Sequence, residues 1–252
     1  MNQSILYALD FDGVICDSAI ETGISGWKAA HQIWPEMPRT PPDAMVEQFR
    51  AVRPIIETGY EAILTMRLLS LGHSVANIAD QYRQLFPQLM SEAGVGIDAL
   101  KSLFGATRDG WIAADRDGWI GKNPLYPGVA EKLRRLNWQD TWYVVTTKQE
   151  RFVGEILQAN GIDLDETRIF GLERKQAKAE ILCDLVKQHP QRRLLFVEDR
   201  LPALLSVRQR PELAAVGLAF AAWGYNLTED QQQAEQHGFS VLSLRDFLVF
   251  AE

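Results

Sequence analysis

The chain has 252 residues, of which 46% are hydrophobic and 23% are charged, and its formal net charge at pH 7 is -7. This length suits one large domain or a domain with an insert, and this composition is that of a globular protein rather than a disordered or fibrous one. The balance of 33 acidic against 26 basic residues argues against a general nucleic-acid-binding protein, which is usually basic.

Cysteine content and hydropathy predict the compartment. The two cysteines, Cys16 and Cys183, give neither a disulfide framework nor a zinc-ligand spacing, which favours a reducing compartment. The longest apolar run begins at Leu213 and falls well short of the roughly 20 residues needed to cross a bilayer. The amino terminus has no basic segment typical of a targeting signal. We therefore expect a cytoplasmic protein with no membrane partner.

Four short apolar runs, at residues 5–9, 142–145, 194–197 and 213–220, are predicted to form strands. Their apolar residues are continuous rather than alternating, which is typical of strands buried on both faces of a parallel sheet. Apolar residues at helical spacing follow Gly128, follow the second run and precede the third. This succession of strands and helices predicts an α/β fold with a doubly wound parallel sheet.

Residues 18–123 do not follow this pattern, because they contain few strand-like runs and many helix-forming segments. Gly72 and Gly94 stand where glycines commonly end helices. We interpret this region as a helical insert, so that residues 1–17 and 124–252 form the α/β core. The near-duplication RDGWIAADRDGWI, which begins at Arg108, lacks the bidentate Glu of a calcium loop and is predicted to contain two glycine turns.

Acidic residues follow two of the predicted strands, Asp10 and Asp12 after the first and Glu198 and Asp199 after the third. Ligands of open α/β sheets bind beyond the carboxyl ends of the strands, so these acids converge if the two strands are neighbours. Carboxylates brought together repel unless a cation or proton lies between them, and oxygen ligands suit Mg²⁺. The alternative is a pair of turn-forming aspartates and a surface pair of Asp199 with Arg200.

Hydroxyl and ammonium groups follow the second predicted strand. Thr146 and Thr147 offer hydroxyls and backbone N–H groups that could bind an anion, although an ordinary helix N-cap is the alternative. Lys148 and Lys178 stand near the starts of predicted helices, where a positive charge opposes the helix dipole unless an anion is bound. The alternative for each lysine is a solvated surface charge.

In this order, these residues resemble the haloacid dehalogenase superfamily. The motifs that carry the resemblance are DFDGV at 10–14, VVTT at 144–147, Lys178, and Glu198–Asp199. The position of the insert is similar to that of the family's helical C1 cap. The segments FVEDRL at 196–201 and DGWIGKNPLYPGV at 117–129 are similar to a less-characterised cyanobacterial and plant branch, which implies no particular substrate.

The resemblance implies that Asp10 is the nucleophile, which forms an aspartyl-phosphate, and that Asp12 is the general acid and base. It implies a Mg²⁺ ion bound by the carboxylates of Asp10 and Asp199 and by the backbone carbonyl of Asp12. Thr146 would donate a hydrogen bond to a phosphoryl oxygen, and Lys178 would stabilise the charge of the transferring group. The implied partner is a small phosphorylated metabolite.

The acid at Asp12 favours phosphate esters, because the dehalogenases and phosphonatases of the family do not use one there. The predicted function is therefore a Mg²⁺-dependent phosphohydrolase acting on a phosphate monoester. The alternatives are a phosphomutase of the β-phosphoglucomutase type and a regulatory protein that binds phosphate and Mg²⁺ without turnover. Neither the substrate nor the oligomeric state is predicted by the sequence.

Several side-chain roles stay open at this point. Glu198 is expected either to join the water shell of the metal or to pair with Lys178, and Lys175 is the alternative catalytic lysine. Asp17 is expected either behind the metal site or as the N-cap of the next helix. In the insert, the candidates to contact substrate are Arg50, Arg53 and Tyr60, each with a solvated or structural role as its alternative.

Overall fold

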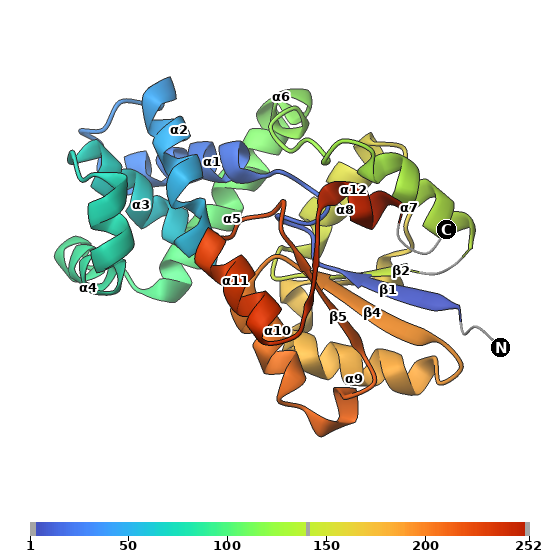
Figure 1. Cartoon of the computed structure of the whole chain (residues 1–252). Coiled ribbons are helices and arrows are strands. Elements are labelled where there is room, and N and C mark those ends of the chain that lie inside the picture. The colour runs from blue at the N-terminus through green and yellow to red at the C-terminus, as the bar shows by residue number, and fades with distance from the viewer. Residues whose placement is uncertain (1–3, 140–141, 250–252) are drawn as a thin grey trace. The chain divides into compact units, whose positions relative to one another are not determined.

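A computed structural model describes residues 4–139 and 142–249 (Figure 1). The chain divides into two compact units. We call Met1–Asp17 with Pro124–Glu252 the core unit, and Ser18–Asn123 the inserted unit. Within the described residues, no helix is long and apolar enough to cross a membrane.

The core unit contains a parallel sheet whose described strands have the order β3-β2-β1-β4-β5-β6. The strands are β1 (Ile5–Leu9), β2 (Trp142–Val145), β3 (Ile169–Phe170), β4 (Arg193–Glu198), β5 (Gly217–Ala221) and β6 (Ser240–Leu242). The strand order reverses direction at β1, because the chain adds β2 and β3 on one side and β4 to β6 on the other. The predicted doubly wound α/β fold is confirmed.

The predicted strands differ from the observed ones where local chemistry or length intervenes. The prediction for residues 213–220 is wrong in its first half, because Pro211–Leu213 forms a 3-10 turn and β5 begins only at Gly217. Pro211 has no backbone N–H to donate to a neighbouring strand, which suits a turn rather than a ladder. Strands β3 and β6 were not predicted, because two or three residues are too few to give a periodic signal.

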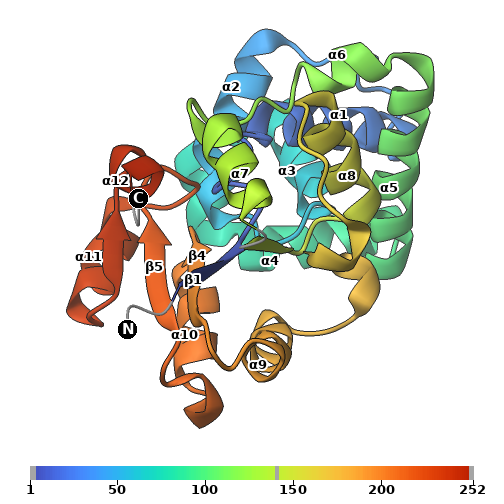
Figure 2. The same ribbon diagram turned by 90° about the vertical axis from the view of Figure 1, so that its right-hand side faces the viewer.

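Helices cover both faces of the sheet (Figures 1 and 2). The core-unit helices are α7 (Val129–Trp138), α8 (Glu150–Ala159), α9 (Lys178–Gln188), α10 (Leu201–Arg208), α11 (Thr228–Gln236) and α12 (Leu244–Val249). Phe196 and Phe220 of the sheet share an apolar cluster with Leu182 of α9 and Leu204 of α10. On the opposite face, a charged side chain packs against an aromatic ring of the sheet. The Nζ atom of the buried Lys132 of α7 lies 5.3 Å from the ring centroid of Tyr7 on β1. This double cover explains why the strands are apolar along their whole length.

Short 3-10 helices complete the regular structure, at Arg53–Ile55, Glu166–Arg168, Leu172–Arg174 and Pro211–Leu213.

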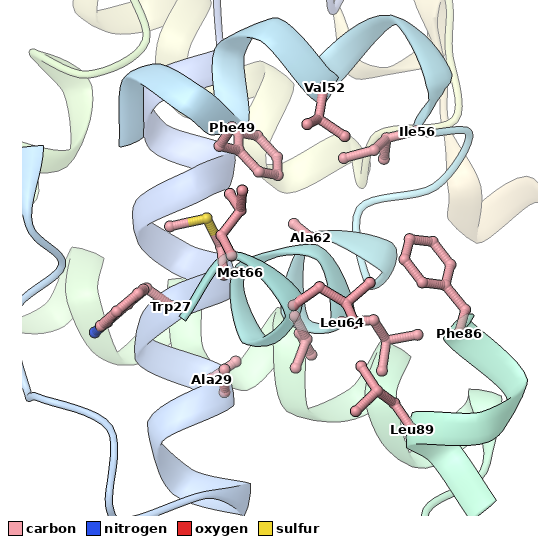
Figure 3. Packing of buried hydrophobic residues seen from close by; sticks show 14 of the residues in the cluster. Trp27, Ala29, Phe49, Val52, Ile56, Ala62, Leu64, Met66, Phe86 and Leu89 are labelled. Carbon is pink, nitrogen blue, oxygen red and sulfur yellow. The ribbon is translucent and has the colours of Figure 1, made fainter. Parts of the chain in front are cut away.

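The inserted unit is entirely helical. Its helices are α1 (Ala19–Ile33), α2 (Asp43–Val52), α3 (Glu61–Ser70), α4 (Val75–Ala93), α5 (Ile97–Ala114) and α6 (Arg116–Ile120). Helices α1 to α5 enclose an apolar cluster that includes Trp27, Phe49, Met66 and Phe86 (Figure 3). Gly72 and Gly94 follow α3 and α4 with φ angles of 88° and 64°, as the sequence pattern predicted for helix ends.

The repeated RDGW segment does not form the two predicted glycine turns. Gly110 lies inside α5 and Gly118 inside α6. The chain breaks between these helices at Asp115, whose side chain accepts a hydrogen bond of 2.9 Å from the backbone N–H of Gly118. The prediction failed because an aspartate N-cap, rather than either glycine, ends one helix and begins the next.

Candidate active site

The candidate site lies at the carboxyl ends of four neighbouring strands of the core unit. Asp10 follows β1, Thr146 follows β2, Asp199 follows β4 and Gly224 lies in the turn after β5. Because the strands are parallel and adjacent, residues more than 200 positions apart in the sequence meet at one edge of the sheet. This arrangement brings the predicted acidic residues together.

Three carboxylates form the centre of the site. Oxygen atoms of Asp10, Glu198 and Asp199 all lie within 4.8 Å of one another, and all three side chains are buried. No other group of three or more potential metal ligands this close together occurs within residues 4–139 and 142–249. The alternative of turn-forming or surface acids is therefore wrong for these residues, since Glu198 is 0% and Asp199 is 1% exposed.

Lys178 supplies a positive charge at this centre. Its Nζ atom lies 2.9 Å from Oδ1 of Asp10 and 2.6 Å from Oε2 of Glu198. Lys175 is exposed and precedes helix α9 with a φ angle of 54°. The structure thus places Lys178, rather than Lys175, between the acids. The other oxygen of Glu198 accepts a hydrogen bond of 3.0 Å from the backbone N–H of Arg200.

Burial and charge act in opposite directions on these groups. Burial, followed by the nearby negative charge of Glu198, raises the pKa of Asp10 to about 6, although Lys178 works against this change. Burial alone would lower the pKa of Lys178, but the attraction of Asp10 and Glu198 outweighs it and the pKa is raised. Lys178 therefore stays charged at neutral pH, and most of the Asp10 carboxyl is ionised there.

Asp12 forms a second ion pair beside this centre. The Nζ atom of Lys148 lies 3.0 Å from Oδ1 of Asp12, and the side chain of Lys148 is fully buried. Oγ1 of Thr146 accepts a hydrogen bond of 3.2 Å from the backbone N–H of Lys148, whereas Thr147 is exposed. Helix α8 begins only at Glu150, so neither threonine is its N-cap. The surface-charge alternative is also wrong for Lys148.

The turn after β5 contributes residues that the sequence did not single out. The backbone N–H of Tyr225 donates a hydrogen bond of 2.6 Å to Oδ2 of Asp199. A Cβ atom on Gly224 would lie 2.3 Å from Cβ of Asp199, and one on Gly13 would lie 2.1 Å from its Oδ2. Only glycine therefore fits at these two positions. Ligands gather at the carboxyl ends of parallel strands, so the end of the predicted strand at 213–220 is the sequence signal that indicates this turn.

Asp17 and Arg53 are two further residues for which the sequence left alternative roles open. Asp17 is not a helix N-cap, because α1 begins at Ala19 after Ser18. Instead Oδ1 of Asp17 accepts a hydrogen bond of 3.0 Å from the phenol of Tyr225. Arg53 belongs to the inserted unit, where it donates a hydrogen bond of 3.1 Å to the carbonyl of Ile56. Its contact with substrate stays a prediction.

The donor set fits a hard divalent cation. The three converging side chains offer only carboxylate oxygens, which are the ligands that Mg²⁺ prefers. The site groups the carboxylates of Asp10, Asp12, Glu198 and Asp199 with the ammonium groups of Lys148 and Lys178. The residues present thus match the predicted Mg²⁺ site in ligand type.

Solved structures of other proteins share this architecture. A predicted phosphoglycolate phosphatase from Haemophilus somnus matches with a TM-score of 0.64 and 18% identity over 100% of both chains. A hydrolase of the haloacid dehalogenase-like family from Streptococcus pneumoniae matches with a TM-score of 0.57 and 17% identity, covering 99% of this chain and 97% of the other. A predicted phosphatase from Clostridium acetobutylicum matches with a TM-score of 0.57 and 13% identity, covering 98% and 97%.

These similarities define the class of fold. The chain has the fold of the haloacid dehalogenase-like hydrolases, as the order of its motifs predicted. No family model and no curated protein matches the sequence, so the relationship is visible in the fold rather than in overall sequence identity.

Proposed function

We propose that the chain is a Mg²⁺-dependent phosphohydrolase that acts on a small phosphate monoester through an aspartyl-phosphate on Asp10. The observation that carries this proposal is the convergence of three buried carboxylates around Lys178 at the carboxyl edge of the sheet. Lys178 contacts two of these carboxylates, and the third, Asp199, lies close to both. This grouping of oxygen ligands with an ammonium group suits a site that binds a cation and the phosphoryl group of a substrate.

In the first half-reaction, a carboxylate oxygen of Asp10 attacks the phosphorus atom of the ester. A bond forms between Asp10 and phosphorus, the bond from phosphorus to the ester oxygen breaks, and the leaving oxygen takes a proton from Asp12. In the second half-reaction, a water molecule gives a proton to Asp12 and attacks phosphorus, which releases phosphate and restores Asp10. Proton transfer by a positioned group such as Asp12 contributes roughly 10²–10⁴-fold to the rate.

The neighbouring side chains prepare these steps. Lys178 lies 2.9 Å from Asp10 and can offset the negative charge that spreads over the transferring phosphoryl group. Lys148 lies 3.0 Å from Asp12 and holds its carboxylate in an ion pair. The acid step needs a proton on Asp12, so we expect the phosphoryl oxygens of a bound substrate to compete with Asp12 for the ammonium of Lys148. The hydroxyl of Thr146 is a donor for the same oxygens.

The metal ligands in this proposal are the carboxylates of Asp10 and Asp199, with Glu198 acting mainly as the counter-ion of Lys178. Glu198 makes the shorter of the two contacts with Lys178, at 2.6 Å, and its other oxygen is already bonded to backbone. When bound, Mg²⁺ supplies positive charge that offsets the repulsion among these acids and polarises a phosphoryl oxygen.

The proposal is tested by phosphate release from p-nitrophenyl phosphate and from a panel of phosphoglycolate, sugar phosphates and nucleotides. Release should require Mg²⁺, stop with EDTA, and fall by at least about 10³-fold in Asp10→Asn, as expected for a lost nucleophile. Asp184→Asn is the matched control, since Asp184 is a half-exposed residue of the core-unit helix α9. Equal rates for wild type and Asp10→Asn would contradict the proposal.

Product analysis separates the other candidate activities. A mutase would convert one sugar phosphate into its isomer without releasing free phosphate. A regulatory protein would bind phosphate and Mg²⁺ with no product at all. Either result would replace hydrolysis as the function of this site.

A further inference from the structure

Tyr225 joins two carboxylates that have different roles. It lies in the turn between β5 and α11, and only 7% of its surface is exposed. Its backbone N–H donates to Asp199, at 2.6 Å, and its phenol donates to Asp17, at 3.0 Å. The backbone N–H would be present in any residue except proline, but the phenol is specific to tyrosine, and a side chain buried only for packing would not need it, since phenylalanine would fill the same space.

The turn around Tyr225 packs closely against Asp199 and the loop after β1. A Cβ atom on Gly224 would lie 2.4 Å from the carbonyl oxygen of Gly13 as well as 2.3 Å from Cβ of Asp199. The indole N–H of Trp223 donates a hydrogen bond of 3.1 Å to the carbonyl of Val14. The turn after β5 is thus held against the loop after β1, with the Asp199 side chain next to both.

Asp17 marks the place where the chain leaves the core unit. Its backbone N–H donates a hydrogen bond of 2.9 Å to the carbonyl of Pro124, the residue at which the chain returns. The backbone N–H of Tyr126 donates a hydrogen bond of 3.0 Å to Ile15, and its phenol is hydrogen-bonded to that of Tyr225. The two connections to the inserted unit are therefore bonded to each other and to Tyr225.

We propose that Tyr225 is a positioning residue of the cation site, which holds the Asp199 carboxylate in place and ties it to the chain junction at Asp17. The inference rests on the proposed function, because the cation concerned is the one proposed to bind Asp10 and Asp199. A charge-assisted hydrogen bond fixes the direction of a carboxylate more firmly than a neutral one. Partners that orient a metal ligand typically change metal affinity by roughly 10–100-fold when they are removed.

The test measures the binding of Mn²⁺ alone, a spectroscopic substitute for Mg²⁺, by electron paramagnetic resonance in the absence of substrate. Gly224→Ala should weaken Mn²⁺ binding by roughly 10–100-fold, because its methyl group displaces Asp199. Tyr225→Phe keeps the backbone N–H and removes the phenol with its bonds to Asp17 and Tyr126, so Mn²⁺ binding should weaken by about tenfold, near the lower limit. Gly154→Ala is the control, since a methyl group there meets open space within α8.

A second comparison separates positioning from a general loss of stability. Asp17→Asn keeps an oxygen acceptor for the phenol and should weaken Mn²⁺ binding less than Asp17→Ala does. If the phenol acts through Asp17, the double variant Tyr225→Phe/Asp17→Ala should bind no more weakly than the worse single variant. Thermal unfolding without metal identifies any variant that fails to fold, and Tyr225→Phe preserves the packing volume if Gly224→Ala does fail.

The outcomes are distinct. Weakened Mn²⁺ binding in folded Tyr225→Phe, with wild-type binding in Gly154→Ala, supports the inference. Wild-type affinity in folded Tyr225→Phe and Gly224→Ala overturns it and leaves the proposed function standing. Failure of the wild-type protein itself to bind Mn²⁺ would overturn both the inference and the Mg²⁺ site of the proposed function.

Discussion

The two units each bury an ion pair, but they use it differently. In the inserted unit, Glu21 is 0% exposed and accepts hydrogen bonds at Oε1 from Ser25, Arg108 and Trp119, at 2.6, 2.8 and 3.0 Å. Arg108 also donates to Oε2 at 2.6 Å, which gives a bidentate pair. These bonds join helices α1, α5 and α6.

In the core unit, one lysine is shared by two carboxylates and a third carboxylate lies beside them. Lys178 contacts both Asp10 and Glu198, while Asp199 lies within reach of the same carboxylates. Breaking a buried ion pair by removing one partner is strongly destabilising, because it leaves an unpaired buried charge. Repulsion among grouped carboxylates is relieved by a proton or by a bound cation. We therefore expect the first pair to be structural and the second cluster to bind a ligand.

The largest effect is expected from Lys178→Met. It leaves Glu198 and Asp10 buried without their shared base, which should lower the free energy of unfolding by about 3–5 kcal/mol in the absence of metal. Phosphatase activity should fall as well, by on the order of 10²–10³-fold, because charge on the phosphoryl group is no longer offset. Urea unfolding and phosphate release measure the two effects.

Lys187→Met provides the matched control for this change. Lys187 lies on the same helix, its side chain is 74% exposed, and it pairs with the half-exposed Asp184 at 3.5 Å. Its replacement should change stability by less than about 0.5 kcal/mol and leave activity unchanged. Equal effects of the two substitutions would contradict a particular role for Lys178 between Asp10 and Glu198.

The pair in the inserted unit should respond differently to single and double substitution. Arg108→Met leaves Glu21 buried without its base and should cost about 3–5 kcal/mol, whereas Glu21→Leu/Arg108→Met should recover much of this loss. Hydrogen exchange measured by mass spectrometry locates the destabilised helices. If the double variant is as unstable as Arg108→Met, the pair does more than balance charge.

The core cluster offers the complementary double variant. Lys178→Met/Glu198→Gln also removes one charge of each sign, yet it should not recover activity, because Lys178 is proposed to act on the phosphoryl group. Recovery of wild-type turnover in this variant would contradict the distinction between a structural and a functional cluster.

The same two clusters show which parts of the candidate site can be predicted from the sequence. The carboxyl ends of the apolar runs at 5–9 and 194–197 predicted where Asp10, Asp12 and Asp199 lie, because parallel strands end at one edge whatever their separation in the sequence. The partners of these acids were less visible. Sequence order left Lys175 and Lys178 as alternatives, and only the three-dimensional path of the chain before α9 distinguishes them.

Other features carried no local signal. Glu21 and Arg108 lie 87 positions apart on different helices, so no spacing rule connects them. Tyr225 contacts Asp199 through its backbone N–H, a group that every residue except proline has. Strands β3 and β6 are too short for a pattern of their own, and the sheet rather than their sequence fixes them.

Mg²⁺ should stabilise the core unit through the cation site. A ligand that binds only the folded state adds about 2.7 kcal/mol when its concentration is a hundred times Kd, which corresponds to a rise of several degrees in Tm. Hydrogen exchange should slow in β1 and β4, which are directly followed by Asp10 and Asp199. Asp199→Asn should abolish most of this stabilisation, and an equal rise in Tm for that variant would place the ion elsewhere.

The smallest effects are expected from substitutions of two glycines in the inserted unit. They test whether the apolar packing of this unit, like its ion pair, tolerates little change. A Cβ atom on Gly26 of α1 would lie 2.7 Å from the backbone of Ala62 on α3, so Gly26→Ala should destabilise by about 1–3 kcal/mol through overpacking. Gly110 lies inside α5 with nothing within 4 Å of the added atom, and Gly110→Ala should stabilise by about 0.5–1 kcal/mol, because alanine favours the helix. Thermal unfolding should therefore shift in opposite directions for the same chemical change. Shifts of the same sign would show that close helix packing does not limit this unit, and that Glu21 and Arg108 dominate its stability.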